Sequence, residues 1–197
     1  MNELRNKITN SINLKSDNLD LLESLVEKIN YQRNDLLIQP GKVCSFIALV
    51  NNGIFRSYII KNGTEFNIDF YMPKTYMSSY TSFITQTPTK GYIQALSNST
   101  VYYLSNSNYQ KLLNTDSEFY KLSKLISETL FIRKCKRETT LLMDTARERY
   151  EFLLKNYPNI EQLIPQYQIA SYLGIKPESL SRMKSLTYIN EKKHTSN

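Results

Sequence analysis

The chain has 197 residues, of which 41% are hydrophobic and 22% are charged, and these ordinary globular values exclude an intrinsically disordered chain. Two cysteines and a single histidine, His194, exclude a four-cysteine zinc site, an iron–sulfur cluster and a histidine-dependent triad. No apolar run reaches the roughly 18 residues that span a bilayer, and residues 1–14 lack the apolar region of a signal peptide. We therefore expect a soluble, cytoplasmic protein.

The formal net charge is +7, and most of the excess lies in the last third of the chain. Residues 1–132 contain 13 basic and 11 acidic residues (+2), whereas residues 133–197 contain 12 basic and 7 acidic ones (+5). The basic residues cluster at Arg133, Lys134, Lys136 and Arg137, and again at Lys176, Arg182 and Lys184. A positive excess indicates an anionic partner, although such runs are also typical of solvated helix faces.

The first half of the chain is predicted to be a helix followed by an antiparallel β-domain. Leucine, isoleucine and valine recur every three to four residues over 14–29, which predicts a helix with Ser16 or Asp17 as its N-cap. Over 31–104, short aromatic and β-branched runs alternate with turn residues, which predicts an antiparallel sandwich or roll. The sharpest hairpin prediction is Asn62-Gly63, because both residues tolerate the positive φ of a type I′ turn.

A long helix is predicted over residues 116–143, with a single apolar stripe. A helix of this length needs another surface to cover the stripe, so we predict a homodimer through this helix. Packing of the stripe against the β-domain of the same chain is the alternative. The predicted dimerisation residues are Phe119, Leu122, Ile126 and Leu130.

The last part of the chain is predicted to contain a helix over 145–157, a break at Pro158 and a compact helical unit from 164 to about 189. Within that unit, Gly174 can end one helix in the left-handed conformation and Pro177 suits the first position of the next. Ile169, Leu173, Leu180 and Met183 are expected to face inward, with Ala170 where the two helices approach closely. This pattern predicts a helix-turn-helix that presents the start of its second helix to the DNA major groove, and an ordinary helical hairpin is the alternative.

The chain resembles the Crp/Fnr family of bacterial transcription regulators over nearly its whole length, especially short Bacteroidetes-type members. The resemblance rests on the run from Ile164 to Met183 and on Pro40-Gly41, Phe46-Ile47, Asn52 to Tyr58, Asn62 to Glu65, Ser82-Phe83, Ile93 to Leu96 and Arg147 to Tyr150. It implies an α+β fold: an antiparallel β-roll of the cyclic-nucleotide-binding jelly-roll type with an N-terminal helix (1–115), a dimerisation helix (116–143) and a helix-turn-helix domain (144–197). Because few residues follow 187, the wing of longer relatives is expected to be reduced or absent.

The resemblance implies a dimeric regulator that binds double-stranded DNA and has RNA polymerase as a further partner. The expected DNA-binding residues are Pro177, Glu178, Ser179, Ser181, Arg182, Lys184, Gln166 and Tyr167. Among them, Arg182 can donate two hydrogen bonds to guanine and Glu178 can accept one from cytosine. Lys184 is expected to contact the DNA backbone.

The family's cyclic-nucleotide site uses a Gly-Glu pair for the ribose and a later Arg-Ser or Arg-Thr pair for the phosphate. In this sequence these positions correspond to Ser78 and Ser79, and to Thr89 and Lys90. The ribose carboxylate and the arginine are missing, so we expect neither cyclic AMP nor another cofactor here, and an effector of unknown kind remains open. Tyrosines over 71–103 could line a pocket, but half-buried strand positions explain them as well.

Two other classes of function are weaker alternatives. The β-roll and the long helix could form a signalling module that binds protein partners, with the C-terminal hairpin as a docking element. An enzyme is the least favoured, because no carboxylate pair, activated nucleophile or phosphate-binding loop stands out. We therefore assign no catalytic and no metal-binding residues.

Overall fold

The computed structural model describes residues 2–194, and the side chains of residues 4–185 within them. The chain forms two compact units. The first contains the chain up to Ile59 together with Asp69–Cys135, and the second contains Ile60–Ile68 together with the chain from Lys136 onward. The tip of one β-hairpin therefore belongs with the C-terminal helices.

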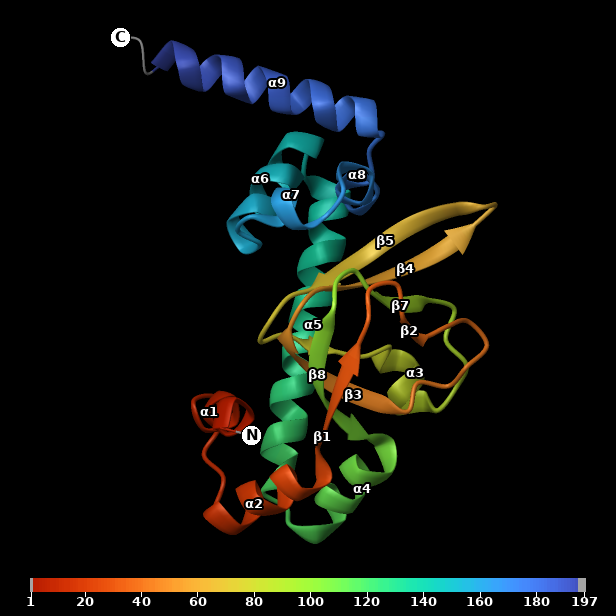
Figure 1. Cartoon of the computed structure of the whole chain (residues 1–197), viewed down its shortest axis with the longest axis vertical. Coiled ribbons are helices and arrows are strands. Elements are labelled where there is room, and N and C mark those ends of the chain that lie inside the picture. Colours follow the sequence, from red (N-terminus) through yellow and green to blue (C-terminus); the bar gives the residue numbers. More distant parts are fainter. Residues whose placement is uncertain (1, 195–197) are drawn as a thin grey trace. The chain divides into compact units, whose positions relative to one another are not determined.

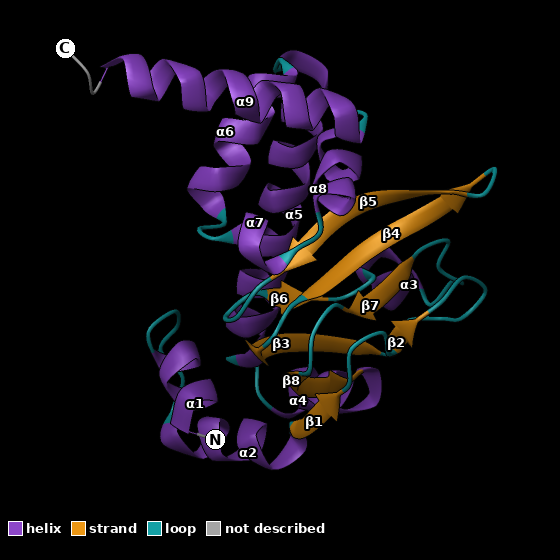
Figure 2. Cartoon of the chain, turned by 45° about the horizontal axis from the view of Figure 1, so that its top comes forward, coloured by secondary structure: helices purple, strands orange, loops and turns teal. Residues whose placement is uncertain are grey.

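The first unit is built on a β-roll of two four-stranded sheets, coloured orange in Figure 2. One sheet has the order β1-β8-β3-β6 and the other the order β2-β7-β4-β5. The strands are β1 (Glu27–Tyr31), β2 (Leu36–Ile38), β3 (Phe46–Asn52), β4 (Phe55–Lys61), β5 (Thr64–Tyr71), β6 (Tyr76–Met77), β7 (Tyr92–Ala95) and β8 (Ser99–Ser105). This antiparallel arrangement confirms the predicted roll.

Two tight turns set the strand register of the roll. Asn62 and Gly63 have φ values of 52° and 76°, which confirms the predicted two-residue hairpin between β4 and β5. Between β3 and β4, Gly53 has φ +81°, and a Cβ there would lie 2.0 Å from Ser99 Oγ. Only glycine fits this turn, because both the backbone conformation and the close approach of β8 exclude a side chain.

Short helices lie around the roll (Figure 1): α1 (Asn2–Thr9), α2 (Ser16–Leu25), α3 (Tyr80–Thr85), which packs against β3, and α4 (Asn106–Thr115), which packs against β8. The predicted first helix is wrong at both ends. Lys15, not Ser16 or Asp17, is the N-cap, and the helix stops at Leu25. It stops there because residues 27–31 pair with β8, which places Ile29 opposite Val101 in a strand.

The long helix α5 (Phe119–Met143) is present as predicted, and its first turns pack on the roll. Phe119, Leu122 and Ile126 are only 1%, 4% and 3% exposed and belong to the core of their own chain, and Leu130 packs against that core. This confirms the alternative for Phe119, Leu122 and Ile126, which pack on the β-domain of their own chain, while a dimer role for the half-buried Leu130 stays a prediction. The apolar stripe identified the side of the helix that the roll covers.

The second unit contains α6 (Ala146–Asn156), α7 (Ile160–Leu163), α8 (Gln166–Leu173) and α9 (Pro177–His194). Thr145 begins α6 with a capping box, in which its hydroxyl and the Glu148 carboxylate cap each other's backbone N–H. The chain then breaks around Pro158 and Asn159, which has φ 65°. Residues 177–194 form one continuous helix where a wing could have begun, and residues 195–197 lie outside the described part.

The predicted domain boundaries at 115 and 143 stay predictions. The observed α5 begins at Phe119 and ends at Met143, close to the predicted helix. No periodicity in the sequence indicated that residues 60–68 would join the C-terminal unit.

Candidate functional site

The C-terminal unit has a helix, a glycine turn and a second helix where the sequence predicts a helix-turn-helix. Gly174 ends α8 in the left-handed conformation with φ 69°, and Ile175 N donates to Ala170 O at 3.0 Å across the turn. Pro177 then begins α9. Ile169, Ala170, Leu173 and Leu180 are fully buried, which confirms the predicted inner face.

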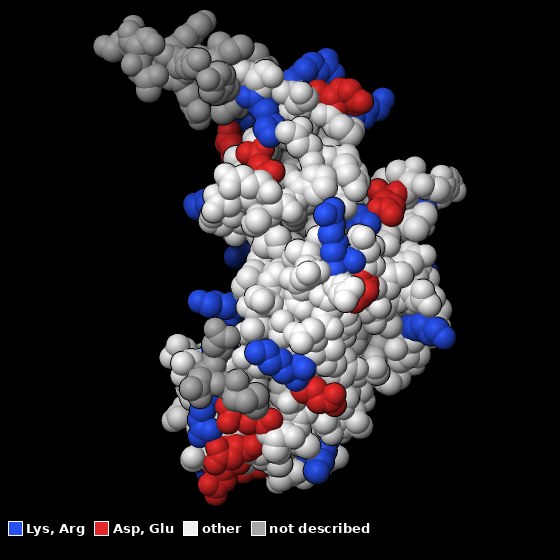
Figure 3. Space-filling view, in the orientation of Figure 1, with Lys and Arg blue, Asp and Glu red and all other residues white. Residues whose placement is uncertain are grey.

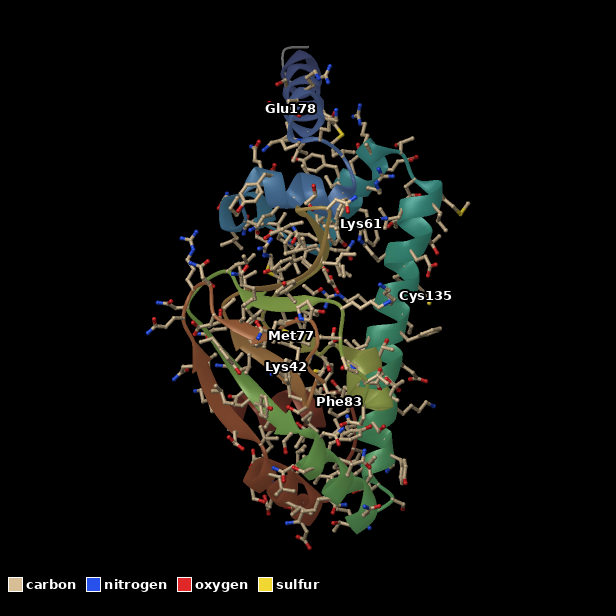
Figure 4. All side chains as sticks on the ribbon, turned by 90° about the vertical axis from the view of Figure 1, so that its right-hand side faces the viewer. Lys42, Lys61, Met77, Phe83, Cys135 and Glu178 are labelled. Carbon is tan, nitrogen blue, oxygen red and sulfur yellow. The ribbon has the colours of Figure 1, made fainter. Side chains whose placement is uncertain are left out.

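The expected base-reading residues lie on the exposed side of the start of α9. Pro177, Glu178, Ser181 and Arg182 are exposed, and Ser179 is half-buried. Figure 3 shows basic and acidic side chains gathered over the beginning of this helix, and Figure 4 labels Glu178 there. This arrangement offers a hydrogen-bond donor and an acceptor within about one helical turn.

The start of α8 offers a second polar surface. Gln166 and Tyr167 are exposed, and the Tyr167 hydroxyl accepts a hydrogen bond from Gln168 Nε2 at 3.2 Å. Both side chains remain open to a phosphate.

Lys184, which is expected to contact the DNA backbone, also has a partner within its own unit. Its Nζ lies 2.5 Å from Glu161 Oε1 in α7, and the same carboxylate oxygen accepts a hydrogen bond from the Tyr150 hydroxyl at 2.7 Å. Lys184 is therefore held in an ion pair that joins α9 to α6 and α7. Sequence spacing placed Lys184 on the predicted recognition helix but could not show that it forms an ion pair with Glu161.

This network shifts the pKa values of Glu161 and Tyr150. Burial alone would raise the pKa of the Glu161 carboxyl, but hydrogen bonds from Lys184 and Tyr150 outweigh it and the pKa is lowered. Burial, followed by the hydrogen bond to Glu161, raises the pKa of the Tyr150 hydroxyl. The Glu161 carboxyl is therefore ionised at neutral pH.

Two arginines that the sequence analysis did not assign hold the C-terminal end of α8. The Arg137 guanidinium donates to Tyr172 O and lies over the Tyr172 ring, 3.9 Å from its centroid. Arg149 Nε donates to Leu173 O at 2.9 Å. Cations at these last carbonyls satisfy groups that a helix leaves unpaired and complement its dipole.

In the first unit, two of the positions that correspond to the family's cyclic-nucleotide site, Ser79 and Thr89, are joined by a hydrogen bond between their hydroxyls. Ser79 Oγ lies 2.9 Å from Thr89 Oγ1, and the buried Ser78 Oγ donates to Phe46 O at 2.8 Å. Lys90 is exposed. Ser79 and Thr89 thus lie at the positions that correspond to the ribose-binding carboxylate and the phosphate-binding arginine of the family, but neither side chain is charged.

A charged side chain of α5, that of Arg133, contacts the roll. Arg133 Nη2 forms an ion pair with Asp69 Oδ1 at 2.8 Å, donates to Phe70 O, and lies 5.0 Å from the centroid of the Tyr71 ring. Both charged side chains are about 20% exposed. Arg133 belongs to a basic run in the sequence, and in the structure it fixes α5 against β5.

Part of the opposite face of α5 is apolar and exposed. Phe131 and Ile132 are 69% and 52% exposed, and Cys135 lies exposed beside them and points away from the strands in Figure 4. Leu142 and Met143 end the helix at about 80% exposure. These exposed apolar residues lie outside the predicted stripe.

The described residues contain no group of three or more His, Cys, Asp or Glu side chains placed to bind a metal ion. In the same part of the chain, no helix is both long enough and apolar enough to cross a membrane.

Comparison with known proteins identifies both parts of the architecture. Residues 28–116 match the cyclic nucleotide-binding domain family. A protein from Eubacterium rectale assigned to the Crp/Fnr family of transcriptional regulators superposes with a TM-score of 0.71 at 16% identity, over 94% of this chain and 88% of that one. The chain has the fold of the Crp/Fnr regulators, and its β-roll is similar to the cyclic nucleotide-binding domain.

Other Crp/Fnr-like folds agree with this assignment. CLP, the c-di-GMP-responsive global regulator of Xanthomonas campestris, superposes with a TM-score of 0.68 at 13% identity, over 89% of this chain and 93% of CLP. FixK2 from Bradyrhizobium japonicum gives 0.65 at 20% identity, over 84% and 86%. No curated protein sequence matches the chain significantly. At these identities the Crp/Fnr-like structures establish the fold, while function has to be argued from the residues.

Proposed function

We propose that this Crp/Fnr-like chain is a sequence-specific DNA-binding transcriptional regulator. The observation that carries the proposal is the exposed start of α9, where Glu178 and Arg182 stand beyond a fully buried helix-turn-helix core. Arg182 would read guanine in the major groove, and Glu178 would accept from a cytosine amino group. Gln166 and Tyr167 at the start of α8 would contact phosphate.

Selection of bound duplexes from a random pool tests this proposal. We expect recovery of a palindrome whose half-sites are about 10 base pairs apart, centre to centre, or a multiple of that spacing. Binding to the selected duplex should fall steeply as salt rises, because phosphate contacts release counterions. Recovery of no preferred sequence, together with salt-independent binding, would favour the protein-partner module instead.

The dimer in this proposal forms through the exposed face of α5. Ile132 and Cys135 lie three residues apart, and Phe131 flanks them, so the three side chains share one side of the helix. Two copies that pack these faces together would cover apolar surface that the roll leaves open, and a two-fold axis would give the palindrome its symmetry.

We further propose that the β-roll does not bind cyclic AMP in the family's manner. Ser79 and Thr89 provide two hydroxyls where a ribose carboxylate and a phosphate-binding guanidinium would be needed, and they hydrogen-bond to each other. A cyclic phosphate buried there would lack a bidentate cation.

Thermal unfolding with added cyclic AMP tests the roll. A nucleotide present at 100 times its Kd would add about 2.7 kcal/mol to the free energy of unfolding, which would raise the Tm by several degrees. We expect no such shift at millimolar cyclic AMP. A saturable rise in the Tm would contradict the proposal that a roll with Ser79 and Thr89 at these positions does not bind cyclic AMP.

A further inference from the structure

The tip of the β4–β5 hairpin contacts the first helix of the helix-turn-helix within the C-terminal unit. Residues Ile60–Ile68 belong to this unit together with α8. Two residues of β5 make the contact, Glu65 through its backbone carbonyl and Asn67 through its backbone N–H and its side chain.

The hydroxyl of Ser171 on α8 bridges two backbone groups of β5. Ser171 Oγ accepts a hydrogen bond from Asn67 N at 3.0 Å and donates one to Glu65 O at 2.9 Å. A hydroxyl can do both because it has one proton and two lone pairs. The serine thus takes the place that a neighbouring strand would occupy.

The geometry of the hairpin explains why these two backbone groups are available. β5 is the edge strand of its sheet, next to β4. The two-residue turn at Asn62-Gly63 sets Lys61 opposite Thr64, so the N–H and C=O groups of residues 65 and 67 point away from β4. A shift of one residue would turn both groups inward and break the contact.

A third hydrogen bond comes from the Asn67 side chain. Its Nδ2 donates to Gln168 O at 3.0 Å, and Asn67 and Gln168 are only 5% and 4% exposed. A helix carbonyl has a second lone pair that can accept such a bond beside its intrahelical one. The hairpin therefore holds the middle of α8, while Arg137 and Arg149 hold its last carbonyls.

We propose that the hairpin tip is a working part of the DNA-binding module, in which Asn67 and Ser171 are positioning residues that orient α8 without touching DNA. A helix of eight residues is too short to hold its direction by itself, so its external contacts decide where its start points. Gln166 and Tyr167 stand at that start. The inference rests on the proposed DNA-binding function, because it concerns affinity for the same duplex.

Four variants of the full chain test the inference. Ser171→Ala removes both bonds of the bridging hydroxyl, and Asn67→Asp replaces the donor to Gln168 O by an acceptor of the same size. Ser171→Thr restores a hydroxyl as a rescue. Thr64→Ala, at an exposed position on the same hairpin, is the matched control.

The first measurement is amide hydrogen exchange without DNA, over residues 60–68 and 166–173. We expect about three- to tenfold faster exchange of both segments in Ser171→Ala and Asn67→Asp, as fits the loss of one or two hydrogen bonds. Ser171→Thr and Thr64→Ala should exchange like the wild type. If Asn67→Asp does not fold, Ser171→Ala decides the question alone.

The second measurement is affinity for the selected duplex as a function of salt. We expect Ser171→Ala to bind about three- to tenfold more weakly with the same salt dependence, because no phosphate contact is lost. Unchanged exchange in Ser171→Ala, or faster exchange with unchanged affinity, would overturn the inference. If the wild type binds no duplex, the proposed function fails, and exchange alone still decides whether the hairpin holds α8.

Discussion

At the scale of single residues, Arg182 bears the most specific prediction for DNA recognition. Its side chain is exposed on α9, where a guanidinium can donate two hydrogen bonds to one guanine. We expect Arg182→Ala to weaken binding to the selected duplex by about 1 to 3 kcal/mol and to remove the preference at one base pair. Titration against duplexes changed at single positions measures both effects. If Arg182→Ala bound its best site with wild-type affinity, the proposed role of Arg182 would be contradicted.

Lys184, two residues further along α9, illustrates why charge alone does not identify a DNA contact. Its ion pair with Glu161 also engages Tyr150, so three helices meet at one carboxylate. The network makes Lys184 a structural residue of the unit, in contrast to Arg182.

This network predicts a pH dependence of stability. The pKa of Glu161 in the folded chain lies below its ordinary value of 4.5, so its stabilisation is complete above that pH and is lost as the pH falls through the folded pKa. Glu161→Gln should therefore lower the Tm at pH 7, and its difference from the wild type should shrink below about pH 4.5. Thermal unfolding between pH 3 and 7 measures this. A difference that is constant across the range would argue against the charged network.

At the scale of elements, the turn between α8 and α9 depends on one backbone conformation. Gly174 has φ +69°, and a Cβ there would meet only Leu141 Cδ2 at 3.7 Å, so space is not the constraint. Gly174→Ala should lower the free energy of unfolding by about 1 to 2 kcal/mol, because an alanine is strained in the left-handed region. Gly174→Asn should be milder, since asparagine tolerates this region. Denaturant unfolding of the three chains measures the order, and equal stabilities would contradict the turn assignment.

Local patterns in the sequence predicted the individual helices, strands and turns better than they predicted which other parts of the chain these elements contact. The Asn62-Gly63 hairpin and the Gly174-Pro177 turn were predictable because they depend on the conformations of a few adjacent residues. The roles of Ser171 and Asn67 were not, because they depend on a contact across about 100 residues of chain.

The apolar stripe on α5 did not identify the candidate dimer surface, for a related reason. A helical period shows that one side is buried, but it does not distinguish the roll of the same chain from a second copy. Phe119, Leu122 and Ile126 face the roll, while Phe131 and Ile132, outside the stripe, are exposed. The candidate dimer surface is therefore visible only once the roll is in place.

At the scale of the whole molecule, the proposed binding to a palindromic DNA site requires a recognition helix in each chain and a second copy of the chain that binds the other half-site. A single helix-turn-helix reads few base pairs, so two linked copies are needed for a specific site. The exposed apolar face at Phe131, Ile132 and Cys135 is the feature of α5 that can supply the link.

The double variant Phe131→Ser, Ile132→Ser tests that link. Removing two exposed apolar side chains from each copy should raise the dimer Kd at least about a hundredfold, since each buried side chain contributes roughly 1.5 to 3 kcal/mol. Sedimentation equilibrium measures the dimer, and binding to the palindromic duplex should weaken in parallel. Ile84→Ser is the matched control, because Ile84 is 53% exposed but lies on α3.

Cys135 provides an independent check of the same surface. The two Cys135 thiols would lie close together in a dimer with parallel α5 helices, so a short bis-maleimide should cross-link wild-type chains to a covalent dimer. The double variant should cross-link poorly, and Ile84→Ser should cross-link like the wild type. The buried Cys44 is not accessible to the reagent. A dimer that persists in the double variant without Cys135 cross-linking would place the interface elsewhere and separate dimerisation from α5.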